Sequence, residues 1–400
     1  MMTPACSTWI PSMTSPAIPD DPRERAAYVA LALTPGLGPR LPDILSACST
    51  PLGAISAPFA FLGTAGFSRA AATAINGATV QDGERVLRQA AAMGAMAILP
   101  GDAGYPGRLA EIPDPPRLLF GHGDITLVTR TAIAVVGSRN HSDYGLHACR
   151  AVVDAAVAAG AVVVSGMARG IDAHAHSRAL DDGGDTIGIL GNGLGVIYPA
   201  ANRALYDRVA RDGLLLTELP PGERPRVYTF PHRNRLIAGL ALITVVVEAA
   251  RTSGSLITAG AALDAGREVM AVPGPITEAT SDGTNALVRD GAAPFLAAED
   301  LWSRLPNAAA QPITRVRPVV APPAHAAAPG PPAAPVLPEG LSEVERRIAW
   351  VLLDGEQDVD VIAREARVDT GAALVELLSL ELRSVVEPRP GRRYRLRAGG

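Results

Sequence analysis

The sequence predicts an α/β protein whose core is a doubly wound parallel sheet, and two patterns in its middle part indicate this fold. Six near-continuous apolar runs recur about every 25 to 30 residues, and they predict buried strands at Thr131–Val136, Ala161–Ser165, Thr186–Leu190, Leu214–Leu219, Leu242–Val247 and Val269–Val272. Helical stretches fill the gaps, at Tyr144–Ala159, Ala173–Leu180, Asn202–Arg211, Asn234–Leu240 and Leu256–Gly266. Strands that are apolar on both faces and alternate with helices are typical of a parallel sheet between two helical layers. In such a Rossmann-like sheet the ligand lies beyond the carboxyl ends of the strands.

The bulk composition sets the class of protein. The chain has 400 residues, which is more than one domain usually needs, and it is 48% hydrophobic and 19% charged, as expected for a globular protein. No apolar run is long enough to predict a membrane span, and residues 1–20 lack the pattern of a secretory signal. The three cysteines are far apart and form no C-x-x-C pair. This disfavours disulfides and a cysteine zinc site, and it suits a cytoplasmic protein.

Arginine alone carries the positive charge of the chain. The net charge is −4, which argues against a uniformly basic nucleic-acid binder. The sequence contains no lysine, so all 36 Lys+Arg residues are arginines. Any contact with a phosphate is therefore made by a guanidinium group or by backbone amides.

Composition divides the chain into five segments. Residues 1–20 are predicted to be a disordered tail, and residues 21–100 a small helical domain with helices at Pro22–Leu33 and Gly83–Met93. Residues 101–305 hold the Rossmann-like domain. Between Pro306 and Gly340, ten prolines and ten alanines among 35 residues predict a semi-extended linker. Residues 341–397 are predicted to form a compact C-terminal unit.

Glycines, hydroxyl groups and arginines follow the predicted strands. The first strand ends in Gly137, Ser138 and Arg139, and the second in Ser165, Gly166, Met167, Arg169 and Gly170. The fifth strand leads to Ser253, Gly254, Ser255 and Thr258. Glycine lets the backbone approach an anion closely, helix N-termini direct unpaired N–H groups at it, and arginine supplies positive charge. The sequence therefore predicts a site for several phosphates at this edge of the sheet.

Motif spacing disfavours a nucleotide cofactor. Gly191, Gly193 and Gly195 form G-x-G-x-G, but Val196 stands where the dinucleotide fingerprint needs a glycine, and the motif follows the third strand rather than the first. A P-loop is impossible without lysine. No cofactor is therefore predicted.

Metal and nucleophile sites are also disfavoured. Asp172 and His176 are four residues apart and share a helix face, but no third metal ligand lies near them in the sequence. The preferred interpretation has Asp172 capping the helix and His176 in a local hydrogen bond. Ser138, Ser165 and Ser255 lie in no G-x-S-x-G elbow. No metal ligand or catalytic residue is predicted.

A basic stretch with aromatic residues lies between Arg203 and Arg235, where seven arginines face four acidic residues. If its centre is extended, side chains of one parity point to one side, namely those of Arg224, Arg226, Tyr228, Phe230 and His232. Such a face would follow a sugar-phosphate strand and stack on its bases. The alternative is that Tyr228 and Phe230 fill the core and the arginines are only solvated.

A series of motifs resembles the DNA-processing protein A (DprA/Smf) family in content and in order. These motifs are Val136–Arg139 with Tyr144-Gly145, Ser165–Asp172 with Ala175-His176, Gly193–Pro199 with Asn202, Thr217–Pro220, Phe230–Arg235, Ser253–Leu256 with Thr258-Ala259, Val272–Gly274, Gly283–Asn285 and Gly291-Ala292. The resemblance covers roughly residues 100 to 300, and the shared order of so many motifs makes it specific.

The resemblance implies a homodimeric protein that binds and protects single-stranded DNA, loads a RecA-type recombinase in natural transformation or recombination, and is not an enzyme. Carried over to this sequence, the DNA pocket would hold Ser138 and Arg139, the turn Gly166–Gly170, Arg233-Asn234-Arg235, and the turn Ser253–Ser255. Family members often place a lysine in this pocket, which only arginine can replace here. Met167 stands where leucine is usual.

Both ends of the chain fit the same family. The turn Leu33–Pro39 resembles the G-x-G turn of a helix–hairpin–helix, and residues 341–397 resemble a winged-helix domain. Its predicted recognition helix, Asp369–Arg383, is acidic and poorly suited to a groove lined with phosphate. The predicted wing is basic, with Arg389, Arg392, Arg393, Arg395 and Arg397. This unit is therefore interpreted as a protein-contact module with some affinity for a nucleic-acid backbone, and not as a reader of bases.

Two rival functions stay open. One is a nucleotide phosphoribohydrolase of the lysine-decarboxylase-like family, which shares this Rossmann variant. Its P-G-G-x-G-T-x-x-E motif is absent, and the nearest stretch, Pro273–Ile276, lacks the second glycine. The other is a regulator that binds duplex DNA through the winged helix, against which the acidic helix argues.

Overall fold

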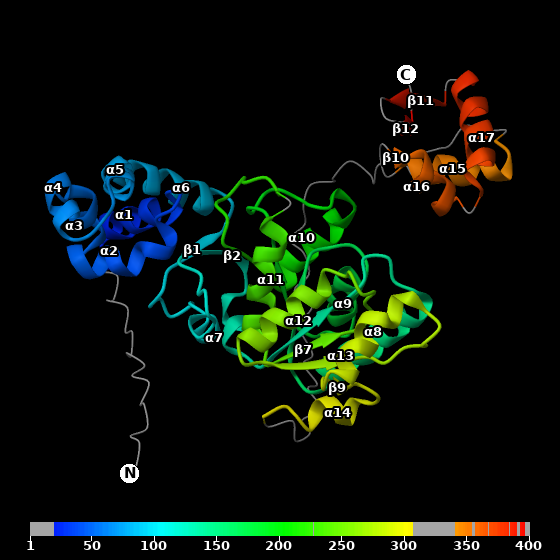
Figure 1. The fold of residues 1–400 in the computed structure, drawn as a ribbon, viewed down its shortest axis with the longest axis horizontal. Helices are drawn as coiled ribbons and strands as arrows, with labels where there is room; N and C mark the ends of the chain where they lie inside the picture. Colours follow the sequence, from blue (N-terminus) through cyan, green and yellow to red (C-terminus); the bar gives the residue numbers. More distant parts are fainter. Residues whose placement is uncertain are drawn as a thin grey trace, which may run out of the picture. The chain divides into compact units, whose positions relative to one another are not determined.

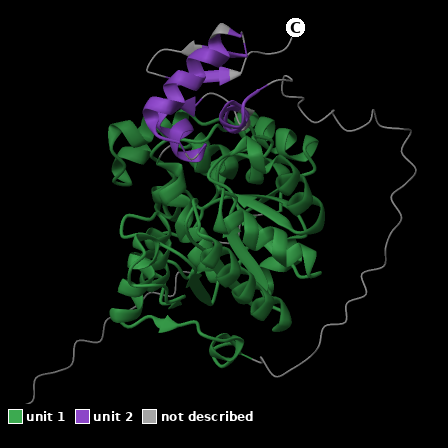
Figure 2. Ribbon diagram, turned by 90° about the vertical axis from the view of Figure 1, so that its right-hand side faces the viewer, with its two compact units in different colours: residues 1–317 green, residues 318–400 purple. Residues whose placement is uncertain are grey.

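The computed structural model describes residues 20–226, 228–306, 341–353, 357–366, 368–383, 385–389 and 393–396. It divides into two compact units, residues 1–317 and 318–400, which Figure 2 shows in different colours. The predicted tail and linker lie outside the described residues, apart from Asp20 and Pro306. Among the described residues, no helix combines the length and the apolar character that a membrane span requires.

The first unit begins with short helices. They are α1 (Pro22–Leu33), the 3-10 turn η1 (Gly38–Arg40), α2 (Leu41–Cys48), α3 (Pro51–Ser56), α4 (Phe59–Thr64), α5 (Arg69–Gly77) and α6 (Val80–Ala92). α1 has the predicted bounds, because the Asp21 carboxylate accepts hydrogen bonds from two amides of its first turn. α6 begins three residues before the predicted Gly83, because Thr79 caps it. Gly36, at φ 79°, lets the chain reverse between α1 and α2.

A nine-stranded sheet forms the centre of this unit (Figure 1). Its strands are β1 (Met96–Ile98), β2 (Leu119–Gly123), β3 (Ala132–Val136), β4 (Val162–Gly166), β5 (Thr186–Ile189), β6 (Leu214–Thr217), β7 (Ile243–Val246), β8 (Glu268–Ala271) and β9 (Ala293–Pro294). They lie in the order β1-β2-β6-β5-β4-β3-β7-β8-β9. The six predicted runs are the parallel strands β3 to β8, so the predicted fold class is confirmed.

One correction concerns the edge of the sheet. β2 pairs antiparallel with β6, and β1 pairs antiparallel with β2, so the sheet is mixed rather than wholly parallel. The sequence does not predict these two strands because β1 has only three residues and two of the five residues of β2 are glycines. Short or glycine-containing strands owe their place to pairing with a neighbour rather than to their own pattern.

Two helical layers cover the sheet. α8 (Asp143–Ala158), α9 (Ile171–Asp181) and α14 (Ala298–Trp302) pack on one face, with strand residues such as Ile133, Val135 and Val163. α7 (Gly107–Ala110), α11 (Thr229–Leu240) and α12 (Ser255–Asp264) pack on the other, with Ala134, Val136 and Val164. Alternate residues of each strand thus enter opposite cores, which is why the strands read as continuous apolar runs. α10 (Arg203–Asp212) and α13 (Asp282–Arg289) complete the connections.

The strand order places a topological switch point beside β3. From β3 the chain winds through β4, β5 and β6 toward one edge, and then returns to β7 on the other side of β3 before it continues to β8 and β9. Connections therefore leave β3 and β7 in opposite directions. In open α/β sheets a ligand binds in the crevice that this divergence creates at the carboxyl ends.

The N-terminal helices share a core with the sheet. Leu31, Ile44 and Ile75 belong to the same buried cluster as Phe120 of β2 and Leu190, which follows β5. Polar contacts reinforce this junction. The Arg25 guanidinium pairs with Asp102 at 2.7 Å, and the Gln89 amide donates to the carbonyl of Pro221 at 3.0 Å. α1 and α6 are thereby fixed to the sheet.

The second unit holds three helices and three strands in its described residues. They are α15 (Glu343–Leu353), β10 (Gln357–Asp358), α16 (Val359–Glu365), α17 (Thr370–Leu382), β11 (Val386–Arg389) and β12 (Arg393–Leu396). The strands form a small antiparallel sheet in the order β10-β12-β11. α17 lies where the acidic helix is expected, and Asp369 caps it. The winged-helix assignment stays a prediction, and Arg392 and Arg397 of the predicted wing lie outside the described residues.

Candidate nucleic-acid interface

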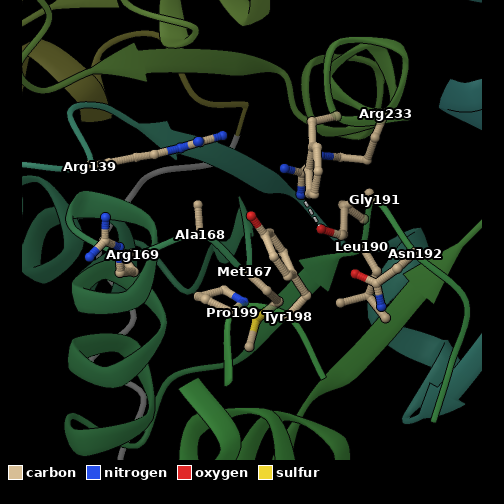
Figure 3. Close-up of a pocket in the computed structure, with 12 residues that line it drawn as sticks. Arg139, Met167, Ala168, Arg169, Leu190, Gly191, Asn192, Tyr198, Pro199 and Arg233 are labelled. Atoms are coloured by element: carbon tan, nitrogen blue, oxygen red, sulfur yellow. Dashed lines mark hydrogen bonds between the residues drawn. The ribbon is translucent and has the colours of Figure 1, made fainter. Parts of the chain in front are cut away.

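A groove of about 560 Å³ lies at the switch point, beyond the carboxyl ends of β3 and β7. The segment Val136–Asn140 forms one side of it, and Thr252–Ser255 with Thr258 forms the other. It continues into a smaller inner pocket at the carboxyl ends of β4 and β5, whose lining residues Figure 3 shows in close-up. Arg139, Ala168, Tyr198, Phe230 and Arg233 line both cavities, so the two form one continuous surface.

The turn after β3 presents an arginine to this surface. Ser138 is held by its backbone, because its amide donates to the carbonyl of Glu248 at 2.7 Å and its carbonyl accepts from the amide of Ile171 at 3.1 Å. Arg139 follows and is exposed, and its side chain makes no hydrogen bond or ion pair with any described residue. Figure 3 shows it pointing across the pocket toward Arg233. Arg139 is therefore available to an anionic ligand.

The turn after β4 is shaped by two glycines. Gly170 has φ 79°, and a Cβ there would overlap the carbonyl oxygen of Ser138. It is the N-cap residue of α9, so the interpretation that Asp172 caps this helix is wrong: Asp172 lies inside the first turn. Ser165 is fully buried and donates to the carbonyl of Val135 at 2.6 Å, which leaves it out of the groove.

Asp172 and Arg233 face each other across Gly166. A Cβ on Gly166 would lie 2.5 Å from Nη1 of Arg233 and 2.6 Å from Oδ2 of Asp172, so only glycine fits there. Burial raises the pKa of Asp172 to about 6, although the charge of Arg233 lowers it. Burial likewise lowers the pKa of Arg233 to about 10, although Asp172 raises it. Nη1 of Arg233 also donates to the carbonyl of Ile189, which anchors α11 on the sheet.

The predicted extended segment Arg224–His232 is wrong. α11 begins at Thr229, five residues before the predicted Asn234. The Thr229 hydroxyl ties the first residue of this helix to the loop after β5, because it lies within donor distance of the Gly191 carbonyl, at 2.6 Å, and of the Arg226 carbonyl, at 2.7 Å. Proline at position 231 is compatible with a first helical turn. On a helix the predicted common face is lost, and Phe230 turns inward while Tyr228 is 64% exposed.

In the structure, the groove contains an aromatic residue other than the predicted Tyr228. The rings of Tyr198 and Phe230 lie 5.3 Å apart, tilted by 39°, and both line the groove and the inner pocket. Tyr198 is 47% exposed, so its ring offers a free face. In the sequence, Tyr198 stands out only as part of a family motif. Its partner Phe230 is 32 positions away, so no local pattern shows that the two rings meet.

The remaining predicted residues divide into two groups. Those that line the groove or the inner pocket are Gly137, Ser138, Arg139, Met167, Arg169, Phe230, Arg233, Asn234, Ser253, Gly254, Ser255 and Thr258. Those that line neither are Ser165, Gly166, Gly170, Arg203, Arg226, Tyr228 and Arg235. Arg226 pairs with Glu223 at 2.7 Å, and Arg235 pairs with Glu218 and Asp114 at 2.7 and 3.0 Å. These carboxylates hold the two guanidinium groups away from the groove.

The turn before α12 supplies backbone donors and hydroxyl groups. Gly254 is the N-cap residue of α12, and the hydroxyl oxygens of Ser253 and Ser255 lie 2.7 Å apart. The helix N-terminus therefore faces the groove with its positive dipole end. The Asn234 amide donates to the carbonyl of Gly254 at 3.4 Å and joins this turn to α11.

The predicted local role of His176 is confirmed. Its Nδ1 lies 2.6 Å from the hydroxyl of Thr186, and its Nε2 lies 3.0 Å from the carbonyl of Gly166. Burial lowers its pKa to about 4, so the ring is neutral near pH 7. Both ring nitrogens are engaged in the core. Within the described ranges, no group of three His, Cys, Asp or Glu side chains is placed to hold a metal ion.

Comparison with known proteins agrees with this fold and site. The sequence profile of the family described as DNA recombination-mediator protein A matches residues 96–306. The chain belongs to this family. It is 44% identical over 200 residues to the DNA processing protein DprA of Streptococcus pneumoniae, which covers 50% of this chain and 71% of that protein. It is 33% identical over 320 residues to the protein Smf of Synechocystis, which covers 75% of this chain and 80% of that one.

A solved structure in the DprA family shows the same architecture. The crystal structure of DprA from S. pneumoniae has a TM-score of 0.62 and is 33% identical in sequence. The match covers 71% of this chain and 98% of the solved chain. The resemblance found in the motifs is thereby confirmed.

Proposed function

We propose that the groove beside β3 and β7 binds single-stranded DNA. Membership of the DprA family gives the chain a role in DNA processing during recombination and transformation. The observation that carries the proposal is that arginines without a side-chain partner lie next to accessible aromatic rings. Arg139 and Arg169 are exposed and unpaired among the described residues, and they lie beside the Tyr198–Phe230 pair. Guanidinium groups bind the backbone of a strand, and aromatic rings stack on its unpaired bases.

The chemistry of the groove favours binding over catalysis, and we propose that the protein is not an enzyme. Its hydroxyl groups lie at turns that suit phosphate oxygens, and those of Ser253 and Ser255 are within hydrogen-bond distance of each other. His176 could serve as a base only if a ring nitrogen were free, and both are engaged. The acidic helix α17 supports a protein partner rather than duplex DNA for the second unit.

The family resemblance supports three finer proposals. The protein protects incoming or processed single-stranded DNA in the cytoplasm, it loads a RecA-type recombinase onto that DNA, and it acts as a homodimer. Size-exclusion chromatography with light scattering tests the oligomeric state of the full chain. Strand exchange by the recombinase on DNA coated with single-strand-binding protein tests loading, which fails as a proposal if the chain does not accelerate the exchange.

Arg139→Ala should weaken binding of oligo-dT and make its salt dependence shallower by about 0.7 in the slope of log K against log salt, the value for one phosphate of a single strand. The reason is that Arg139 is exposed and unpaired within the described chain, so its charge is free to replace counterions. Fluorescence anisotropy across a salt series measures both effects. Arg226→Ala is the matched control and should leave the slope unchanged, because Glu223 already neutralises Arg226. Equal slopes for Arg139→Ala and wild type would remove Arg139 from the interface.

Removal of residues 341–400 should leave the affinity for oligo-dT within a factor of a few. Every groove residue lies in the first compact unit, which ends at Arg317. The same anisotropy titration compares the truncated and full chains. Loss of binding on truncation would place the DNA contacts in the second unit.

A further inference from the structure

Glu248 lies at the N-terminus of α8, although it belongs to the turn after β7. Its side chain is buried, with the residue only 2% exposed. Its Oε2 accepts a hydrogen bond from the amide of Ser142, the N-cap residue of α8, at 2.9 Å. Its carbonyl accepts from the amide of Ser138 at 2.7 Å, so the backbone of the turn after β3 also holds it in place.

The first turn of α8 is built around this carboxylate. Gly145 lies against it, and a Cβ at that position would overlap Oε2. The hydroxyl of Ser142 accepts from the amide of Gly145 at 3.0 Å, which completes the cap. Oε1 of Glu248 is buried, and no donor in the described part of the chain bonds to it. The positive end of the helix dipole stabilises a negative charge at this point.

In doubly wound nucleotide-binding sheets, an anion from the ligand takes this position. The helix that follows the first parallel strand directs its N-terminal amides at the phosphate of the nucleotide. Here β3 is the first parallel strand and α8 is the helix that follows it. The amide of Ser142 is already bonded to Glu248, and a phosphate beside the carboxylate would meet like charge.

We propose that Glu248 is a built-in anion that occupies the phosphate position of the fold and thereby excludes free nucleotides. The groove beside Glu248 is then available to a ligand whose phosphates bind near Arg139 and the N-terminus of α12 rather than at α8. The phosphates of a DNA strand could be placed in this way. This last step rests on the proposed function, whereas the exclusion of nucleotides does not.

Chemical rescue of Glu248→Ala in the full chain tests the proposal. The variant should have a lower Tm than wild type, because α8 loses its anion. Added inorganic phosphate or formate should restore about 2–4 °C relative to chloride at equal ionic strength, as ligand binding to the folded state does. Wild type should show no such specific rise. Glu268→Ala removes an exposed glutamate that pairs with Arg304 and controls for general salt effects.

Each other outcome contradicts the proposal. An equal rise in wild type would mean that the position is open while Glu248 is in place. A folded Glu248→Ala protein without rescue would mean that the position does not take an anion. Should this variant not fold, Glu248→Ser is used, and failure of both to fold in phosphate and in formate also overturns the inference.

The proposed function fails separately. AMP should bind to Glu248→Ala in isothermal titration calorimetry but not to wild type, and binding of AMP by wild type would overturn the exclusion. Oligo-dT should bind to wild type in either case if the groove takes single-stranded DNA. Absence of oligo-dT binding together with anion rescue would reject the proposed function and leave the role of Glu248 standing.

Discussion

Arg233→Ala is expected to lower the free energy of unfolding by about 3–5 kcal/mol, the usual cost of leaving a buried charge without the nearby opposite charge that compensates it. Both Arg233 and Asp172 are buried, at 6% and 8% exposure, and they face each other across Gly166. Without the guanidinium, the Asp172 carboxylate stays in a buried position with its main opposite charge gone. Urea denaturation monitored by circular dichroism measures the loss.

The loss should shrink as the pH falls from about 8 to about 5. Burial already raises the pKa of Asp172 to about 6, and removal of Arg233, which lowers it, raises it further. A carboxyl whose pKa is higher in the folded chain binds more protons when folded. Its folded state therefore loses stability as the pH rises through the folded pKa, and regains it as the pH falls.

Arg235→Ala provides the matched control for this experiment. Arg235 lies two residues further along α11 and pairs with Glu218 and with the exposed Asp114. Its removal should cost less than that of Arg233, because Asp114 is exposed and water can solvate part of this cluster. Equal losses for the two variants, or a pH-independent loss for Arg233→Ala, would contradict the account of the buried pair.

Tyr198→Ala should weaken oligo-dT binding by about 1–3 kcal/mol, the value of one base stacked on an aromatic ring. The slope of affinity against salt should stay nearly unchanged, because the side chain carries no charge. Tyr198→Phe should bind like wild type, since it keeps the ring. Anisotropy titrations at several salt concentrations separate these effects.

Tyr228→Ala tests the correction to the sequence interpretation. Tyr228 is 64% exposed, bonds to Arg226 and lines neither cavity, so its removal should not affect binding. Normal binding by Tyr198→Ala together with weak binding by Tyr228→Ala would restore the extended segment that the structure replaces with a helix. Val227, which stands between Arg226 and Tyr228 in the sequence, lies outside the described residues.

The parallel core of the fold could be predicted because its signal is local. Apart from the exposed Glu268 at the start of β8, the residues of β3 to β8 are buried on both faces, so each run is nearly all apolar, and the helices between them are long enough to show their own pattern. The turns of the site were predictable for a related reason. Glycine is required at 170, where the segments after β3 and β4 approach each other, and at 166, where the side chains of Asp172 and Arg233 come close, and such glycines are visible in the sequence.

The other features of the fold and of the site depend on contacts between residues that are far apart in the sequence. The first residue of α11, Thr229, is held by the carbonyl of Gly191, and Tyr198 lies in the groove beside Phe230. Glu248 reaches the N-terminus of α8 from 106 residues away. Two arginines of the predicted basic stretch, Arg226 and Arg235, are held outside the groove by Glu223 and Glu218. A pattern along the chain does not show which partner a side chain meets.

The shared core of the N-terminal helices and the sheet determines how the first unit unfolds locally. Phe120 and Leu190 are buried in the same cluster as Leu31 and Ile44, so release of the helices would expose apolar surface of the sheet to water. Opening of the helices alone is therefore costly, and the most protected amide hydrogens of α1 and β5 should exchange at similar rates in deuterated water. The N-terminal helices are therefore a fixed part of the first unit and not a separately folding module.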